Sequence, residues 1–202
     1  MKNEEKKSRI SWLMENIRAL QSELDAELAK QRARLSYGLE KGRAVFEQEI
    51  LRRQKELKIS LFKYVTHANI LTVLTAPVIY AMIVPFVFLD ICVSIYQFVC
   101  FPAYGITKVK RNDYIVFDRE YLAYLNLLQK INCGYCSYAN GVAGYVREVA
   151  GRTEEYWCPI KHAKKMVNAH EHYKNFVEFG DAESFRELMK HEQPLHKEAK
   201  ES

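Results

Sequence analysis

The apolar stretch from Asn69 to Ile106 most constrains what this chain can fold into. Asp90 is its only acidic or basic residue, and the nearest charges outside it are Lys63 and Lys108. About 18 apolar residues in a row already suggest a membrane span. The sequence therefore predicts that this segment lies in a lipid bilayer.

The length of the stretch favours two passes over one. It is about twice the roughly 20 residues that one spanning helix needs, so we expect a two-helix hairpin over residues 66–107, with its turn near Asp90 in the headgroup region. Both flanks are basic, as is typical of cytoplasmic segments. The basic flanking residues are Arg52, Arg53, Lys55, Lys58, Lys63, Lys108, Lys110 and Arg111. We expect an inner or plasma membrane with both termini cytoplasmic; the alternative is one span ending near Asp90, followed by an interfacial segment.

Three polar or reactive side chains lie within this stretch. A membrane-embedded carboxylate such as Asp90 can belong to an ion path, but with no basic partner in the stretch we expect no transport by a monomer. Cys92 and Cys100 are expected to pack as small apolar side chains, with lipid attachment at Cys100 as an alternative.

Residues 1–65 have the pattern of a charged helical stalk. Apolar residues alternate at spacings of three and four, which is coiled-coil spacing. They are Ile10, Leu13, Ile17, Leu20 and Leu24. We expect a long helix over residues 8–63 that binds a second copy or a protein partner, with its likeliest bend at Gly38 and Gly42. The alternative is a helix that folds back at these glycines onto its own protein.

Residues 108–192 have the pattern of a small helical module, so that the predicted fold class is all-α. A first helix is expected after a capping Asp118, ending at Asn132 or Cys133, and a second over residues 137–156. Pro159 is expected to open a third helix that runs to about Phe179. Gly180 and Asp181 would end that helix and cap a fourth, and residues 193–202 are expected to form a disordered tail.

Four residues of this module match the spacing of a zinc site, C-x2-C-x21-C-x3-H: Cys133, Cys136, Cys158 and His162. A turn between two helices and the start of a third would supply two ligands each, as structural zinc sites do. The alternatives are an iron–sulfur cluster, a redox pair or unliganded core cysteines. Ser137 stands where a c-type haem needs histidine, and the cytoplasm disfavours a disulfide. We expect structural zinc.

Catalysis has less support in the sequence. Glu148 and Arg152 are spaced as a stabilising ion pair on a solvated helix face. A metal with four protein ligands has no open position for substrate, which favours a structural role. If His162 were unbound, Glu148 or Glu155 would be the first candidates for a general base. His170 and His172 are expected on different faces of one helix, which disfavours a second metal site.

The charge distribution argues against two other classes of protein, those that bind nucleic acid and those that begin with a secretory signal. The formal net charge of +5 is spread over both flanks, with no basic run interleaved with exposed aromatics, so we expect no nucleic-acid binding. The charged beginning of the chain does not have the pattern of a secretory signal. We therefore expect a membrane-anchored scaffold or adaptor with a zinc-stapled module. The rival is a membrane-bound redox or metalloenzyme that uses the Cys/His cluster directly.

Overall fold

The computed structural model describes residues 2–34, 37–40, 43–46 and 48–192, and side chains over most of this range. The protein is mostly helical, as the all-α prediction requires, and it divides into two compact units. Unit 1 comprises residues 1–61 with 118–126, and unit 2 comprises residues 62–117 with 127–202. Each unit is described by itself. The predicted disordered tail, residues 193–202, lies outside the described residues.

Unit 1 begins with helix α1 (Lys2–Arg34), and among the side chains of this helix that the structure describes none is buried. The chain then forms an antiparallel hairpin of β1 (Tyr37–Glu40) and β2 (Arg43–Phe46), and continues into α2 (Gln48–Glu56). The long helix expected over residues 8–63 is therefore interrupted by a hairpin where only a bend was expected. The break falls at the predicted place, because Gly38 pairs within the hairpin instead of weakening a helix.

Unit 2 contains α3 (Leu61–Thr66) and then two apolar helices, α4 (Ile70–Ala81) and α5 (Ile83–Tyr104), which follow one another across Met82. The Asn69 side chain caps α4 by accepting a hydrogen bond from Leu71 N at 2.9 Å. Gly105 ends α5 in the left-handed conformation, at φ 71°.

Asp90 lies within α5 and not in a turn. The predicted turn there is wrong, because Asp90 has partners inside the fold and does not need headgroups or water. In place of two antiparallel apolar helices, α4 and α5 form one apolar segment over Ile70–Tyr104.

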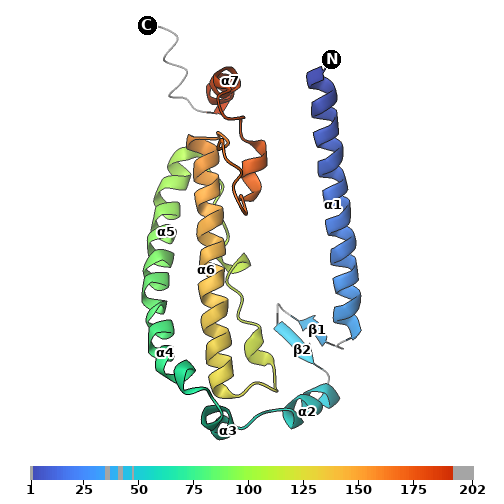
Figure 1. Ribbon diagram of the computed structural model, residues 1–202, viewed down its shortest axis with the longest axis vertical. Coiled ribbons are helices and arrows are strands. Elements are labelled where there is room, and N and C mark those ends of the chain that lie inside the picture. The colour runs from blue at the N-terminus through green and yellow to red at the C-terminus, as the bar shows by residue number, and fades with distance from the viewer. Residues whose placement is uncertain (1, 35–36, 41–42, 47, 193–202) are drawn as a thin grey trace. The chain divides into compact units, whose positions relative to one another are not determined.

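The core of unit 2 lies between α5 and α6 (Leu127–Trp157), which run side by side in the same direction (Figure 1). Residues 105–117, the return segment, bring the chain back along this pair and include the 3-10 turn η1 (Arg111–Asp113). Phe101 of α5, Val109 of the return segment, and Tyr145 and Val149 of α6 form the buried cluster.

Gly141 lets the return segment approach α6 closely. A Cβ at this position would lie 2.7 Å from Tyr114 O and 2.9 Å from Ile115 Cα, which are backbone atoms. The close approach needs a residue without a side chain.

Three helix boundaries predicted for residues 108–192 are wrong. Only a 3-10 turn, η2 (Arg119–Tyr121), follows Asp118, and α6 starts later and runs through Cys133 without a break. Packing along α5 offsets the roughly 1 kcal/mol by which each interior glycine disfavours a helix. Pro159 does not start a helix either, because its carbonyl accepts a hydrogen bond from Val177 N at 2.8 Å.

The last part of the described chain contains the 3-10 helix η3 (Glu171–Asn175) and α7 (Ala182–Glu192). Asp181 Oδ1 accepts a hydrogen bond from Ser184 N at 3.0 Å, and Gly180 precedes it at φ 88°. The predicted cap at Asp181 is confirmed. The predicted stop at Gly180 is not, because the preceding helix η3 already ends at Asn175.

Candidate functional site

The four predicted metal ligands do not come together in the structure. Cys133 and Cys136 lie on the first turns of α6, whereas Cys158 follows its last residue, Trp157. At 1.5 Å per residue, the helix between Cys136 and Cys158 separates them by about 33 Å. One ion needs all its protein ligands within about 2.0–2.3 Å. The arrangement gives the four residues no shared site.

The second predicted ligand pair also lacks the expected geometry. No helix begins at Pro159, so the one-turn spacing that would align Cys158 with His162 is absent. Both side chains are exposed, and the His162 ring stacks on that of Tyr173, with centroids 6.2 Å apart. Within the described residues, no group of three or more His, Cys, Asp or Glu side chains is arranged to hold a metal. Zinc and iron–sulfur binding stay predictions from the sequence.

A polar seam runs where α5 packs against α6, and it consists of Asp90, Ser94 and Gln97 on α5 with Tyr138 and Tyr145 on α6. Asp90, Ser94 and Gln97 follow one another at spacings of four and three, which places them on one face of α5. Tyr138 Oη donates to Asp90 Oδ2 at 2.9 Å, and the hydroxyls of Ser94 and Tyr145 are 3.4 Å apart. The side of α5 that faces the protein therefore carries polar residues beside the apolar Phe101.

Asp90 is nearly fully buried, and its charge is balanced from the return segment. Arg111 Nε lies 2.9 Å from Asp90 Oδ1, and Arg111 Nη2 lies 2.6 Å from Asp90 Oδ2. This is a two-pronged arginine–carboxylate pair, and the hydrogen bond from Tyr138 gives the carboxylate a third donor. A search for a partner within the apolar stretch misses Arg111, because it lies 21 residues further along the chain.

Gln97 joins α5, the return segment and α6 through hydrogen bonds. Its Nε2 donates to Val109 O at 3.2 Å and to Tyr145 Oη at 3.0 Å, while its Oε1 accepts from Val109 N at 2.6 Å. Every polar atom of this buried amide has a partner, which is the condition for burying it without loss of stability. The return segment is thereby fixed against the middle of α5.

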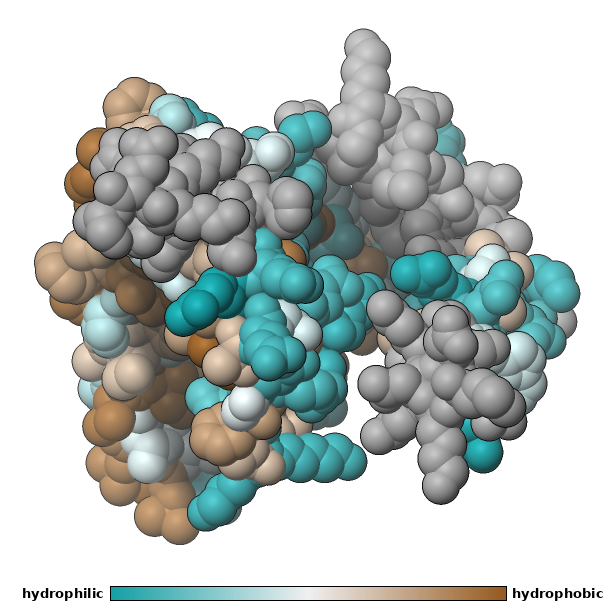
Figure 2. All heavy atoms as spheres, turned by 90° about the horizontal axis from the view of Figure 1, so that it is seen from above, coloured by the Kyte–Doolittle hydropathy of each residue, from teal (hydrophilic) through white to brown (hydrophobic). Residues whose placement is uncertain are grey.

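The opposite side of α4 and α5 is apolar and uncovered, and we call it the apolar face. Its most exposed members are Ile70, Leu71, Leu74, Val78, Val84, Phe88, Ile91, Ile95, Phe98 and Val99. Figure 2 shows brown apolar residues gathered on the side where α4 and α5 lie. In a water-soluble protein the buried side of a surface helix is apolar and its outer side polar. Helix α5 departs from this arrangement, because its outer side is apolar and its buried side holds Asp90 and Gln97 beside Phe101.

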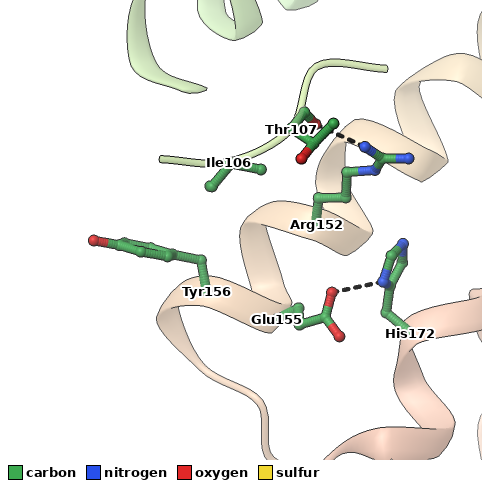
Figure 3. A pocket seen from close by; sticks show the side chains of 6 residues that line it. All are labelled: Ile106, Thr107, Arg152, Glu155, Tyr156 and His172. Carbon is green, nitrogen blue, oxygen red and sulfur yellow. Dashed lines mark hydrogen bonds and ion pairs between the residues drawn. The ribbon is translucent and has the colours of Figure 1, made fainter. Parts of the chain in front are cut away.

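A second cluster of charges joins the end of α6 to η3. His172 Nε2 lies 3.1 Å from Glu148 Oε1, and His172 Nδ1 lies 2.6 Å from Glu155 Oε2 (Figure 3). Arg152 Nε donates to the same Glu148 oxygen at 2.9 Å. Both ring nitrogens of His172 therefore lie against carboxylate oxygens of α6.

This cluster borders a pocket of about 350 Å³. Its lining residues are Ile106, Thr107, Arg152, Glu155, Tyr156 and His172 (Figure 3). The charged side chains of the lining have partners within it. His172 pairs with Glu155, and Arg152 Nη1 donates to the backbone carbonyl of Thr107 at 2.7 Å. The arrangement holds the return segment and η3 against α6.

The predicted ion pair of Glu148 with Arg152 is confirmed, but its face of α6 is not solvated. The Glu148 side chain is only 15% exposed. Burial raises the pKa of its carboxyl, yet the hydrogen bonds from His172 and Arg152 together outweigh burial, and the pKa lies below the ordinary 4.5. Glu148 is therefore an anion paired with His172 and Arg152, and it is a poor general base at neutral pH.

His170 and His172 were expected on different faces of one α-helix, and the structure instead brings their rings to 5.8 Å beside α6. His170 Nε2 lies 2.9 Å from Glu154 Oε2. Gly151 makes room for that ring, since a Cβ there would lie 2.9 Å from His170 Nδ1. In the sequence, this cluster is indicated by the spacing of Glu148, Gly151 and Glu155 on α6. Which histidines these residues contact depends on tertiary packing.

Comparison of the chain with known protein families, with curated proteins and with solved structures finds no match. The argument for function therefore depends on the arrangement of residues described above. Of its features, the apolar face and the polar seam beneath it are the most unusual for a protein in water.

Proposed function

We propose that this chain is a membrane-associated scaffold or adaptor, held to a bilayer by the apolar face of α4 and α5. The observation that carries the proposal is the reversed polarity of α5, with Asp90 and Gln97 buried and Phe88, Ile95 and Val99 exposed. An apolar exterior around a polar interior suits a helix whose outer surroundings are lipid.

The length and exposure of the apolar segment support this proposal. Ile70–Tyr104 is long and apolar enough to cross a membrane, and the most apolar 18-residue window within it has a mean hydropathy of 2.4. Only 6% of that window is buried inside the protein, whereas the core helix of a soluble protein is mostly buried. Fully burying one Val, Leu, Ile or Phe side chain is worth about 1.5–3 kcal/mol. The exposed members together represent a driving force on the order of 10 kcal/mol.

The scaffold part of the proposal rests on α1. Its apolar stripe is uncovered within the part of the chain that the structure describes, with exposed fractions of 46% at Leu13, 53% at Ile17 and 59% at Leu24. A charged helix of this length gains most of its stability from packing of such a stripe. A second copy or a partner protein that covers the stripe would supply that packing.

The rival function, a membrane-bound redox or metalloenzyme, required one centre formed by Cys133, Cys136, Cys158 and His162. Because α6 lies between the two pairs in the chain, the rival stays a prediction from the sequence and is not the function that we propose. A zinc staple is for the same reason not part of the scaffold proposal.

Vesicle flotation with the full chain tests the membrane proposal. We expect the protein to float with phospholipid vesicles, and Phe88→Gln with Ile95→Gln to reduce the bound fraction about tenfold or more, because each side chain contributes apolar burial. The matched control is Val167→Gln with Phe179→Gln, two exposed apolar residues outside α4 and α5. A chain that stays monodisperse in lipid-free buffer and does not float would overturn the proposal.

A further inference from the structure

We infer that α4 and α5 lie in the plane of one membrane leaflet, apolar face inward, and do not cross the bilayer. This inference rests on the proposed membrane association and adds its geometry. The occupant of the apolar face is the acyl region of a leaflet whose headgroups are anionic.

The first argument is length. The 35 residues of Ile70–Tyr104 extend about 52 Å at 1.5 Å per residue, against a hydrocarbon core of about 30 Å. To fit that core the whole segment would have to tilt by about 55°, whereas spanning helices tilt by up to about 40°. The 22 residues of α5 alone extend about 33 Å, so length excludes a crossing by the whole segment and not by α5 alone. A segment lying in the plane has no such limit.

The second argument is the direction in which polarity changes within unit 2. It changes from α5 to the return segment beside it, and not from one end of α5 to the other. The contacts of Gln97 with Val109 and of Asp90 with Arg111 fix the return segment beside the middle of α5. That segment carries Lys108, Lys110, Arg111 and Asp113. If α5 spanned the membrane, these charges would enter the hydrocarbon at about 2.5–3.5 kcal/mol for each Lys, Arg or Asp at its centre. Side-on binding keeps them out of the hydrocarbon.

The outer face of α6 supports the same orientation. Cys136, Asn140, Ala143 and Arg147 are all exposed and recur at spacings of four, three and four, which places them on one stripe of the helix. Tyr138, by contrast, faces α5 through Asp90. A stripe with an amide and a guanidinium suits water, whereas the outer face of α5 at the same height suits lipid.

The third argument is the positive charge at the border of the apolar face. Lys108 Nζ lies 4.6 Å from the ring centroid of Phe98, which is itself 71% exposed on that face. Lys110 is also exposed and follows on the same segment. Lysines at the edge of a buried apolar surface reach the headgroup layer, where they attract anionic lipids.

The basic flanks of the apolar segment favour an arrangement in which both of its ends lie on the same side of the membrane. Positive flanks favour the cytoplasmic side for both ends. A hairpin with its turn at Asp90 would satisfy them, but α5 is continuous there. Side-on binding satisfies both flanks without a turn.

Two native cysteines can distinguish side-on binding from crossing. Cys92 and Cys136 are both exposed in the protein, Cys92 on the outer face of α5 and Cys136 on that of α6. The Asp90–Tyr138 contact aligns the helices so that the two cysteines differ in height by only about 6 Å, or four residues. The experiment uses full-length variants that retain one of them, with the other four cysteines replaced by alanine.

Each variant is bound to vesicles containing phosphatidylglycerol, and the vesicles are opened by freezing and thawing so that a water-soluble maleimide reaches both leaflets. Rates are normalised to the same variant unfolded in dodecyl sulfate. We expect Cys136 to react at close to its unfolded rate and Cys92 at least tenfold more slowly. The same variants carrying a fluorophore on the retained cysteine should be quenched by brominated acyl chains at Cys92 and not at Cys136.

The other outcomes separate the two proposals. Protection of both cysteines would mean a crossing helix pair, which overturns side-on binding and leaves membrane association intact. Rapid labelling of both, together with failure to float, would overturn both proposals. Protection of Cys92 without quenching by brominated lipid would mean that a second copy covers the apolar face, and this too overturns the inference.

Discussion

At the scale of single residues, Asp90 shows how a charge can be held inside an apolar helix. Its carboxylate is nearly fully buried and receives hydrogen bonds from Arg111 and Tyr138, which are donors from two other segments. A buried ion pair adds little stability compared with apolar residues of the same shape, but removal of one partner leaves an uncompensated charge. The pair therefore specifies how the return segment docks.

This asymmetry predicts the effects of substitution. Arg111→Ala should destabilise the protein by about 2–3 kcal/mol, a value below the fully buried case because the Arg111 side chain is 40% exposed. Arg111→Ala combined with Asp90→Asn should recover at least half of that loss, because no charge is then left unpaired. Denaturant unfolding in micelles measures both, with Arg186→Ala of α7 as a control. Equal destabilisation by the single and the double variant would contradict the argument.

Gly141 and Gly134 form a matched pair on α6. A Cβ at residue 141 would lie 2.7 Å from Tyr114 O, whereas a Cβ at residue 134 would have no described atom beyond its own stretch of helix within 4 Å. We expect Gly141→Ala to destabilise by about 1–3 kcal/mol, because backbone must shift. Gly134→Ala should stabilise by about 0.5–1 kcal/mol through helix propensity. Thermal unfolding of the two variants measures the difference, and the same sign for both would refute the packing of the return segment on α6.

Glu148 gives a pH dependence with a definite sign. Its pKa in the folded protein lies below 4.5, so the carboxylate stabilises the fold above that pH, and the contribution is lost as the pH falls through the folded-state pKa. Glu148→Gln should therefore lower the unfolding temperature at pH 7 but have a progressively smaller effect as the pH falls below about 4. Thermal unfolding at a series of pH values tests this. An effect of Glu148→Gln that stays constant to pH 3 would exclude the ion pairs as its cause.

At the scale of elements, the sequence predicts what depends on local chemistry and misses what depends on contacts. The start of α7 follows from Asp181, because a cap acts within a few residues. The continuity of α6 through Cys133 does not follow, since its support comes from α5. The apolar segment is evident from composition. That α5 buries Asp90 and exposes apolar side chains is visible only in the structure, where Asp90 pairs with Arg111.

The candidate site divides in the same way. The Glu148–Arg152 pair lies within one helix and follows from spacing, and the structure confirms it at 2.9 Å. The contacts of His172 with Glu148 and Glu155 join residues from separate elements, so no local pattern indicates them. The zinc prediction relied on a turn at Cys133 and a helix at Pro159, and the structure has neither.

Helix α1 carries a prediction of its own. If its stripe binds a second copy, Ile17→Glu with Leu24→Glu should convert the full chain in micelles to a monomer, because charges on a coiled-coil seam prevent its burial. Light scattering during gel filtration measures the mass. Gln21→Glu with Ser22→Glu adds the same charge outside the stripe and should leave the mass unchanged. A monomeric unsubstituted chain would exclude self-association and leave a protein partner for α1.

At the scale of the whole molecule, the basic charge and the apolar face are parts of one membrane-binding arrangement. The net charge of +5 is modest, but Lys108 and Lys110 lie on the return segment, next to the apolar face that Phe98 belongs to. Charge at this border can act together with apolar burial, whereas charge elsewhere on the surface cannot. The same charge change should therefore have different effects at different places.

Lys108→Gln with Lys110→Gln should weaken binding to phosphatidylglycerol vesicles by about 25-fold, since each lysine near an anionic surface contributes about 1 kcal/mol, or roughly fivefold. Lys164→Gln with Lys165→Gln removes the same charge from exposed positions outside the return segment. This control should change binding less than threefold. Vesicle sedimentation at two salt concentrations measures both variants, and the difference between them should shrink at high salt because screening shortens the reach of the lysines. Equal losses for the two variants would mean that net charge alone, and not its place beside the apolar face, directs the protein to the membrane.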